Sequence, residues 1–329
     1  MRPTASPLAV WAGLVVLYLV WGSTYLGIRI AVETIPPFTM GGFRFFVAGV
    51  ILATAVGWRS RRTLVRPSLR QLRDTTIVAS CLMGGGMGLV AWGEGHSVPS
   101  GVAALLIGLM PMWLAILSRI VLGERLAPLT AVGIGIGIIG VAILAWPTGE
   151  VGGMRPEGLA ALIVSPMLWS AGTIYAARKA DLPRPALFST GVQMMIGGLV
   201  LFALGALTGE LATFDLAAVS TRSTVGLLYL TVIGSLVGYT TYAWLLTVAL
   251  LPRIATYAYV NPVVAVVLGA LIASEPFGLR EVVASVVIVA AVVLIVTARS
   301  REQQPGRLAA AAAARPAVED SVAEPGAAG

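Results

Sequence analysis

The hydrophobic positions of this chain fall into long runs, and polar clusters interrupt them at intervals of about twenty residues. A helix needs about 20 apolar residues to cross the hydrocarbon core of a bilayer. No connection between the runs is long enough for a folded soluble domain. We therefore predict ten spanning helices, at residues 9–31, 37–58, 75–93, 99–121, 129–146, 157–178, 186–208, 223–246, 253–273 and 279–298.

The run Val98–Leu126 is repeated, 151 positions later, as Ala249–Phe277. Each copy has a proline near its middle and a glutamate in the tight loop that closes it. Ala104, Pro111 and Glu124 align without a gap with Ala255, Pro262 and Glu275. The first and sixth runs also match, because a tryptophan in each, Trp21 and Trp169, is followed by small and hydroxyl residues.

A repeat of five spans must run through the membrane in opposite senses, because five is odd. The predicted fold is an all-α integral membrane protein with ten transmembrane helices as two inverted five-helix repeats, 9–146 and 157–298. We expect the tail, 299–329, to be disordered. Its alanine run leaves a helical extension as the alternative.

The composition agrees with a lipid solvent, since 57% of the residues are hydrophobic and only 11% are charged. A soluble domain has roughly a quarter charged residues. The net charge of +7 comes from basic residues between apolar runs rather than on one face, so nucleic acid is not an expected partner. One cysteine, Cys81, excludes an intramolecular disulfide.

Arginine is concentrated in the connections on one side of the predicted bundle, with six in the 59–73 connection alone. The connections on the other side hold only Arg155, Arg222 and Arg280. Basic loops stay in the cytoplasm, so both termini are expected there.

The segments WGSTYLGIRIAVETIPPFTMGGFRFFVAG, SGVAALLIGLMPMWLAILSRIVLGERL and NPVVAVVLGALIASEPF resemble the EamA-type branch of the drug/metabolite transporter superfamily. The resemblance covers residues 10–298. It implies a ten-helix carrier in a bacterial-type inner membrane, with a central cavity surrounded by helices three, four, eight and nine together with one and six. Helices five and ten would lie at the periphery. No acidic residue lies at mid-depth in any predicted span, so no carboxylate is singled out there for proton coupling.

Aromatic and hydroxyl side chains collect on the helices expected to line the cavity. They would suit an amphiphilic organic solute, because such sites combine apolar walls with a few polar groups. Packing or interfacial anchoring is the alternative for these residues. The predicted cavity residues are Trp21, Thr24, Tyr25, Trp92, Trp169, Thr173, Tyr239, Tyr242 and Asn261.

Four further residues are candidates for hinge or gate roles. Pro111 and Pro262 each remove a backbone hydrogen bond in mid-helix, which gives either a static kink or a hinge. Arg44 lies inside helix two and would pair structurally, for example with Glu94 or a carbonyl, or bind a substrate carboxylate. Glu94 ends helix three and is a candidate gating or protonation site.

No nucleotide-binding, metal-binding or nucleophile motif occurs, and the chain has one histidine, so we expect neither an enzyme nor a cofactor. The predicted function is a secondary transporter that exports a small organic metabolite or drug by alternating access. An importer or facilitator of the same fold, and a non-transporting scaffold or receptor, are the alternatives. The expected partners are the bilayer and the solute, with a coupling proton left open, and the expected assembly is a monomer or weak dimer.

Overall fold

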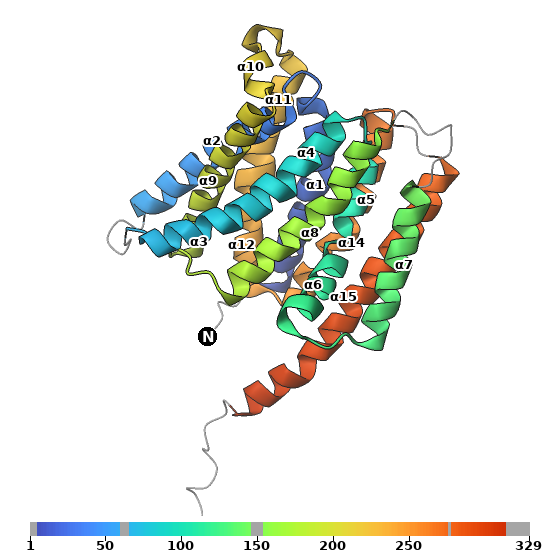
Figure 1. Ribbon diagram of the computed structural model, residues 1–329. Helices are drawn as coiled ribbons and strands as arrows, with labels where there is room; N and C mark the ends of the chain where they lie inside the picture. Colours follow the sequence, from blue (N-terminus) through green and yellow to red (C-terminus); the bar gives the residue numbers. More distant parts are fainter. Residues whose placement is uncertain (1–4, 60–65, 146–153, 276–277, 314–329) are drawn as a thin grey trace, which may run out of the picture.

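The computed structural model describes residues 5–59, 66–145, 154–275 and 278–313, and this part of the chain is built from helices and their connections without a strand (Figure 1). The α-helices are α1 (Pro7–Ala31), α2 (Pro37–Arg59), α3 (Leu69–Ala79), α4 (Gly88–Gly95), α5 (Ser100–Gly108), α6 (Met110–Leu122), α7 (Pro128–Ala145), α8 (Pro156–Arg178), α9 (Ala186–Leu207), α10 (Glu210–Thr213), α11 (Thr221–Tyr229), α12 (Gly238–Val248), α13 (Leu251–Ile254), α14 (Tyr257–Ile272) and α15 (Leu279–Ala313). Two π-helical segments, η1 (Ser80–Met87) and η3 (Leu230–Val237), and a 3₁₀ turn, η2 (Leu216–Ala218), complete the order.

Within the described residues, nine helical stretches are long and apolar enough to cross a membrane. The stretch α3–η1–α4 forms one of them and α11–η3–α12 another. The ninth expected span, 253–273, is a shorter helix of 16 residues, α14, preceded by the single turn of α13. The fourth expected span is interrupted at Leu109, next to Pro111, where α5 ends and α6 begins.

The last helix is longer than predicted. α15 continues to Ala313, so the first part of the tail, which we expected to be disordered from residue 299, is helical as far as the structure describes it. Glutamine, arginine and alanine follow the last apolar turn, and all three favour helix. Residues 314–329 lie outside the described part of the chain.

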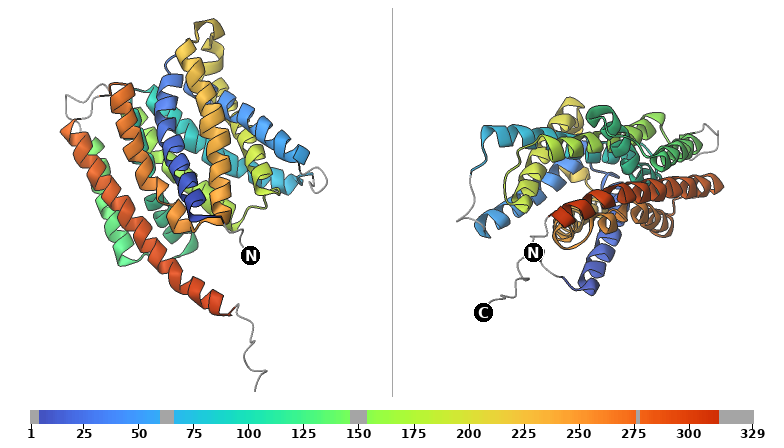
Figure 2. Two further views of the ribbon diagram at one scale, coloured as in Figure 1. Left: turned by 180° about the vertical axis from the view of Figure 1, so that it is seen from behind. Right: turned by 90° about the horizontal axis from the view of Figure 1, so that it is seen from below.

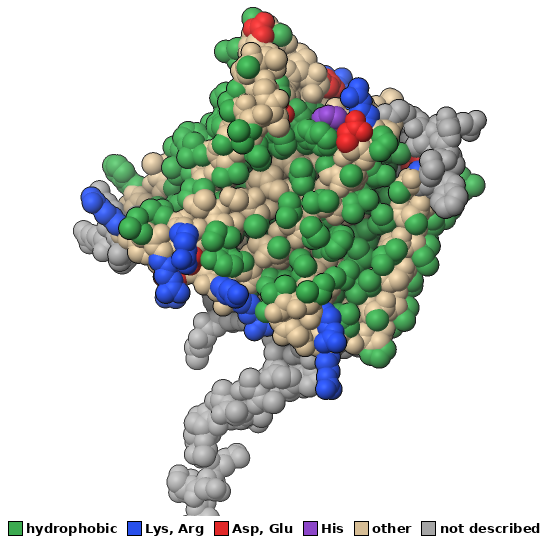
Figure 3. Space-filling model, in the orientation of Figure 1, with side chains coloured by type: hydrophobic (Ala, Val, Ile, Leu, Met, Phe, Trp, Pro, Cys, Tyr) green, Lys and Arg blue, Asp and Glu red, His purple; other side chains and the backbone are tan. Residues whose placement is uncertain are grey.

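Charged side chains gather at the two ends of the bundle and leave an apolar belt between them (Figure 3). We call one end the basic end, after Arg70 and Arg73 in the first turns of α3, Arg119 and Arg178 in the last turns of α6 and α8, and Arg299 beside Glu124. The start of α1 and the last turns of α15 also lie there (Figures 1 and 2). Acidic side chains and the histidine gather at the opposite end (Figure 3).

At the opposite end, the short helix α10 ties the connection after α9 to the start of α2. The Glu210 carboxylate accepts hydrogen bonds from the backbone N–H of Thr39 at 2.9 Å and from its hydroxyl at 3.2 Å. Burial raises the pKa of the Glu210 carboxyl, and the bonds from Thr39 oppose that rise. The carboxylate thus satisfies a free donor in the first turn of α2.

Two helix pairs hold the bundle together through glycine. A Cβ added to Gly49 of α2 would lie 2.4 Å from the backbone nitrogen of Met195 in α9, so the two backbones touch there. On the other side of the bundle, α7 packs along α15 (Figure 2). A Cβ on Gly133 of α7 would lie 2.6 Å from Ile295 of α15. The glycine face of α7 therefore packs directly on α15.

We expect Gly49→Ala to lower the stability of the bundle by about 1–3 kcal/mol, because the new methyl group meets backbone that can move only if α9 moves. The matched control is Gly135→Ala, since a Cβ at Gly135 in α7 meets nothing within 4 Å. Thermal melting of both purified variants in detergent tests this. Equal melting temperatures for the two variants would contradict the close α2–α9 contact.

Candidate functional site

Two spans contain a π-helical segment at matching positions. At its end, the backbone N–H of Gly88 donates to the carbonyl of Met83, and that of Gly238 donates to Ile233. The two segments, η1 and η3, are 150 positions apart. A π turn widens the helix locally and leaves carbonyls poorly satisfied, and such turns are frequent at functional sites.

The two tryptophans that the sequence singled out lie against these segments, each from a helix of the other half of the chain. A Cβ on Gly238 would be 2.5 Å from the indole nitrogen of Trp21, which belongs to α1. A Cβ on Gly86 would be 2.7 Å from the ring of Trp169, which belongs to α8. The absence of a side chain at each glycine makes room for the indole.

Trp21 belongs to an aromatic cluster, which we define as Trp21, Tyr239, Tyr242 and Tyr257. The ring centroid of Trp21 lies 5.6 Å from that of Tyr239, 5.1 Å from Tyr242 and 5.2 Å from Tyr257. Edge-to-face and tilted pairs of this kind stabilise by about 0.5–1.5 kcal/mol each beyond their burial. The cluster therefore joins α1 firmly to α12 and α14.

A cavity of about 640 Å³ opens at the basic end, between α6 and α8 on one side and α12, α14 and α15 on the other. Its size is that of a typical small-molecule site. Of the predicted cavity residues, Trp169, Thr173 and Tyr242 line it, as does Pro111. The other lining residues are Met110, Leu114, Ser118, Leu122, Glu124, Ile174, Ala177, Arg178, Ile254, Ala255, Tyr257, Ala258, Val296 and Arg299.

The walls of the cavity differ in two respects from what the family resemblance implied. Helices one and three were expected around it, but α1 and the stretch α3–η1–α4 contribute no lining residue within the described part of the chain. Helix ten was expected at the periphery, but Val296 and Arg299 of α15 reach the lining. Arg299 makes this contact because α15 crosses the mouth of the cavity at the basic end. Helix five, α7, contributes no lining residue within the described part of the chain.

Charge at the mouth of the cavity centres on Glu124, which follows α6. Its carboxylate lies 2.8 Å from a guanidinium nitrogen of Arg178 and 3.7 Å from one of Arg299. Glu124 and Arg178 are about half exposed, so the pair contributes little to stability. The arrangement instead presents one carboxylate and two guanidinium groups to anything that enters.

At the opposite end, a residue that follows α14 is tied to the start of α5 by a contact that we call the Glu275 latch, made of Glu275, Ser100 and Gly101. The Glu275 carboxylate accepts hydrogen bonds from the backbone N–H of Ser100 at 2.9 Å, from its hydroxyl at 3.0 Å and from the N–H of Gly101 at 3.4 Å. These N–H groups begin α5 and have no partner within their helix. A carboxylate there also meets the positive end of the helix dipole.

Glu124 and Glu275 leave their helices through the same turn. The residue before each has a left-handed backbone, with φ of 68° at Gly123 and 51° at Ser274. The backbone N–H of each glutamate donates to a carbonyl six residues earlier, at 3.3 Å in Glu124 and 3.1 Å in Glu275. Left-handed backbone disfavours serine, so the position of Ser274 is imposed by its surroundings. The two equivalent carboxylates therefore differ only in what they bind.

The Glu275 latch also fixes the direction of two helices. The end of α14 meets the start of α5, so the span α5–α6 and the helix α14 run in opposite senses (Figure 1). Within α14, Pro262 packs against Gly108 of α5, where an added Cβ would lie 3.0 Å from the proline ring. Pro262 therefore lies at the interface with α5, whereas Pro111 faces the cavity.

Four of the predicted cavity residues pack inside the bundle. The Thr24 hydroxyl donates to the carbonyl of Trp21 at 2.6 Å, and the Tyr25 ring packs against the largest apolar core. The indole of Trp92 stacks on His96, with ring centroids 3.7 Å apart. Asn261 is buried in α14, and its side-chain oxygen has no hydrogen-bond partner among the described residues. A role for these four in binding remains a prediction.

The two buried charges that we expected to pair do not do so. Arg44 is 2% exposed, and its guanidinium donates to the hydroxyl of Ser235 at 3.0 Å and lies 4.7 Å from the centre of the Phe45 ring. Glu94 is fully buried, and both its carboxyl oxygens are without a hydrogen-bond partner in the described part of the chain. The sequence indicates that Arg44 and Glu94 lie in the interior. It does not show that the Arg44 guanidinium is hydrogen-bonded to a serine of η3.

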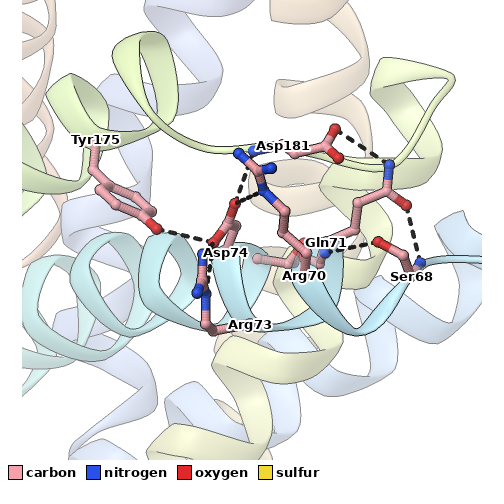
Figure 4. Close-up of polar contacts among 8 residues, drawn as sticks. Ser68, Arg70, Gln71, Arg73, Asp74, Tyr175 and Asp181 are labelled. Atoms are coloured by element: carbon pink, nitrogen blue, oxygen red, sulfur yellow. Dashed lines mark hydrogen bonds and ion pairs between the residues drawn. The ribbon is translucent and has the colours of Figure 1, made fainter.

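A polar network at the basic end was missed by the sequence reasoning (Figure 4). Asp74 of α3 is fully buried and accepts hydrogen bonds from the Arg73 guanidinium at 2.8 Å, from the Tyr175 hydroxyl at 2.9 Å and from the backbone N–H of Asp181 at 2.9 Å. The side chain of Gln71 reaches Asp181 as well. The network fastens α3 to the end of α8, beside the cavity mouth.

These features define the class: a multi-pass helical membrane protein with a solute-sized cavity that opens at one end. The model of the EamA-like transporter family matches residues 9–146 and again 156–297. The uncharacterized inner membrane transporter YedA of Escherichia coli K12 is 35% identical over 269 residues, which cover 82% of this chain and 84% of that protein. The chain belongs to the EamA-like transporter family, within the drug/metabolite transporter superfamily.

Two further comparisons extend this result. A probable terminal-alkyne amino-acid exporter of Streptantibioticus cattleyicolor is 31% identical and aligns over 72% of this chain and 75% of its own length. A crystal structure of a protein only 20% identical shares the fold, with a TM-score of 0.59 over 91% of this chain and all of that one. The chain is thus a membrane transporter whose relatives are inner membrane proteins.

We expect Asp74→Asn to cost about 1–3 kcal/mol of stability, because three donors then share a neutral acceptor that carries an N–H₂ of its own. Asp181→Asn is the matched control, since that side chain is exposed and its backbone N–H would remain. Melting temperatures of the two purified variants measure the difference. Equal melting temperatures for the two variants would show that the Asp74 network does not stabilise the fold.

Proposed function

We propose that this chain is a secondary transporter that exports a small organic metabolite or drug by alternating access through the cavity between its two halves. The observation that carries the proposal is the contrast between the two ends. The cavity is open at the basic end, while the Glu275 latch closes the opposite end. A carrier needs a solute-sized cavity that is open to one side at a time.

The same proposal includes ten transmembrane helices in two inverted repeats. Its support is the agreement of independent details at a nearly constant spacing: the π segments, the left-handed turns before Glu124 and Glu275, and the opposite directions of α5–α6 and α14. The packing of α2 with α9 and of α7 with α15 brings corresponding spans of the two halves together, as a two-fold axis would.

We further propose that the basic end faces the cytoplasm, with both termini there. The rule that basic residues flank the cytoplasmic ends of spans supports this orientation. The structure would then be the state that is open to the cytoplasm and ready to receive a solute for export.

In the other state, we propose that the two glutamates exchange roles. The inverted repeat makes Leu251, at the start of α13, the counterpart of Ser100. Glu124 would leave Arg178 and Arg299 and accept the N–H of Leu251 alone, because Pro252, the counterpart of Gly101, has no N–H and the N–H of Arg253 donates to Leu250. Glu275 would release Ser100 at the same time. Glu275 would close the opposite end in one state, and Glu124 would close the basic end in the other. The two closures would alternate because the helices joined by each contact tilt together.

The cavity chemistry supports an amphiphilic solute. Its walls are apolar and carry the rings of Trp169, Tyr242 and Tyr257, on which an apolar or aromatic group would stack. Its mouth carries the Glu124 carboxylate and the guanidinium groups of Arg178 and Arg299, which would bind an ammonium and a carboxylate. A small zwitterion with an apolar body, as in an amino acid, fits both parts.

Alternating access is tested with one reporter cysteine, Leu114→Cys, in a Cys81→Ser background, because Leu114 lines the cavity. A membrane-impermeant maleimide should label it from the basic end only. Adding Glu275→Ala should raise labelling from the opposite end by about tenfold or more, since three hydrogen bonds to a charged acceptor are lost.

The control for this experiment is Glu33→Ala, which removes another carboxylate at the same end. Glu33 lies 3.3 Å from Arg222 in an exposed ion pair. Labelling that stays confined to the basic end in both variants would show that the Glu275 latch is not a gate. Labelling of the wild-type reporter from the outside of intact cells would reverse the proposed orientation.

Transport is tested with purified protein in liposomes, by counterflow of labelled apolar and aromatic amino acids and amphiphilic amines. We expect uptake of at least one of them, and a decrease of about tenfold or more in Trp169→Ala, because the largest ring of the cavity wall is removed. Trp244→Ala is the control, since Trp244 is partly exposed on α12. Suppose that none of these solutes is transported but Glu275→Ala still changes labelling from the opposite end. The conformational change would then serve a function other than transport of amino acids or amphiphilic amines.

A further inference from the structure

Glu94, the next-to-last residue of α4, is in a setting that the cavity does not explain. Its side chain has no exposed surface, and neither carboxyl oxygen has a hydrogen-bond partner in the described part of the chain. Only its backbone carbonyl is engaged, by a guanidinium nitrogen of Arg29 at 2.7 Å. A buried carboxyl group without a partner is rare in folded proteins, because it has lost water and gained nothing in return.

The charged and titratable groups around Glu94 come from three other parts of the fold. Arg29 and Tyr25 are on α1, Arg44 is on α2, and Glu275 follows α14. Arg29 donates to the Glu94 backbone and Arg44 donates to Ser235. Among the described residues, neither guanidinium group is hydrogen-bonded to the carboxyl group. His96, two residues further, bonds the carbonyl of Trp92 and stacks on its ring.

This environment selects among the ligands that a carboxyl group could hold. An ionised carboxylate without donors costs several kcal/mol in a low-dielectric interior, whereas the protonated group costs much less. A metal cation would need several oxygen ligands, and no group of three or more His, Cys, Asp or Glu residues gathers within the described residues. A proton is the ligand that this site accommodates.

We expect Glu94 to be buried only while the opposite end is closed. Glu275, which forms the latch there, is close enough to act on the Glu94 carboxyl electrostatically. When the latch opens, water reaches the carboxyl group, and the ionised form becomes stable because it is hydrated and lies between Arg29 and Arg44. Ionisation and opening therefore favour each other.

From this geometry we infer that Glu94 is a proton-binding site of the carrier, protonated while the opposite end is closed and deprotonated when that end is open. In the step itself, the O–H bond of the carboxylic acid breaks, its proton passes to water at the opposite end, and the carboxylate remains between the two arginines. The role of Glu94 in transport rests on the proposed two-state cycle. Its protonation in the closed state does not depend on that cycle.

The pH dependence has a definite sign. The closed state binds one proton more than the open state, so a lower pH favours closure and a higher pH favours opening. Between the pKa values of the two states, the ratio of open to closed protein should change by about tenfold per pH unit. In a proton-driven exporter, a low pH outside would therefore favour closure of the opposite end, and this closure returns the empty carrier to the state that is open at the basic end.

The first test reads the protonation state directly. Infrared spectra of the purified wild-type protein near neutral pH should contain the carbonyl stretch of a buried protonated carboxylic acid. We expect Glu94→Gln to lose that band and Glu33→Gln to keep it. A band of the same strength in wild type and Glu94→Gln, or no band in wild type at all, would overturn the assignment.

The second test reads the coupling to opening. Maleimide labelling of the Leu114→Cys reporter from the opposite end should rise as the pH is raised, and Glu94→Gln should abolish this dependence. A pH dependence that Glu94→Gln leaves intact would overturn the coupling. If Glu94→Gln does not fold, Glu94→Asp, which keeps a titratable group, should shift the pH of half-maximal labelling, and an unshifted profile would again contradict it.

The two tests separate this inference from the proposed function. The infrared band depends only on the closed state, so its loss in Glu94→Gln supports the proton site even if no solute is transported. The proposed cycle fails on its own evidence, when Glu275→Ala leaves the reporter labelled from one end only.

Discussion

The structure depends on a carboxylate placed at the start of a helix in the membrane. The first N–H groups of α5 have no partner in their own helix, and lipid offers none, so a buried helix start must find an acceptor elsewhere in the protein. Glu275 supplies it from the end of α14, with hydrogen bonds of 2.9 Å and 3.0 Å to Ser100. That contact joins two helices that run in opposite directions, at the end of the bundle away from the cavity mouth. In the proposed cycle it closes that end.

Glu124 is the counterpart of Glu275 in the first half of the chain. Comparing the two shows that closure can depend on what the carboxylate binds rather than on the glutamate itself. Glu124 and Glu275 leave their helices through the same left-handed turn, yet one binds two arginines at an open mouth and the other binds a helix start. An ion pair that is half exposed is weak, whereas a carboxylate on buried N–H groups is strong. The asymmetry of the cavity thus follows from which helix start is within reach.

The sequence predicted the spans well because about twenty consecutive apolar residues have few other uses. A row of small residues such as Gly133 and Gly137 is typical of a helix–helix contact in lipid, and α7 packs on α15 there. Side-chain direction was harder. The proximity of Trp21 to the aromatic cluster, and of Trp92 to His96, depends on helix rotations that a uniformly apolar helix does not encode. The Asp74 network was not predictable, because Tyr175 and Asp181 are 101 and 107 positions away and Asp181 binds through its backbone N–H. Likewise, nothing local to Arg44 indicates a serine 191 positions away.

The two π segments have a consequence for the origin of the chain. A π turn holds one residue more than the α turn it replaces, so each segment records a single-residue insertion. The insertions occupy corresponding positions, Ser80–Met87 and Leu230–Val237. One insertion in an ancestral five-helix unit, copied when that unit was duplicated, would leave this pattern. Removing the extra residue from either copy would turn the rest of that span by about 100°, which would carry Gly86 or Gly238 away from the indole that lies on it. Neither half of the chain can lose its insertion alone without losing its fit to the other.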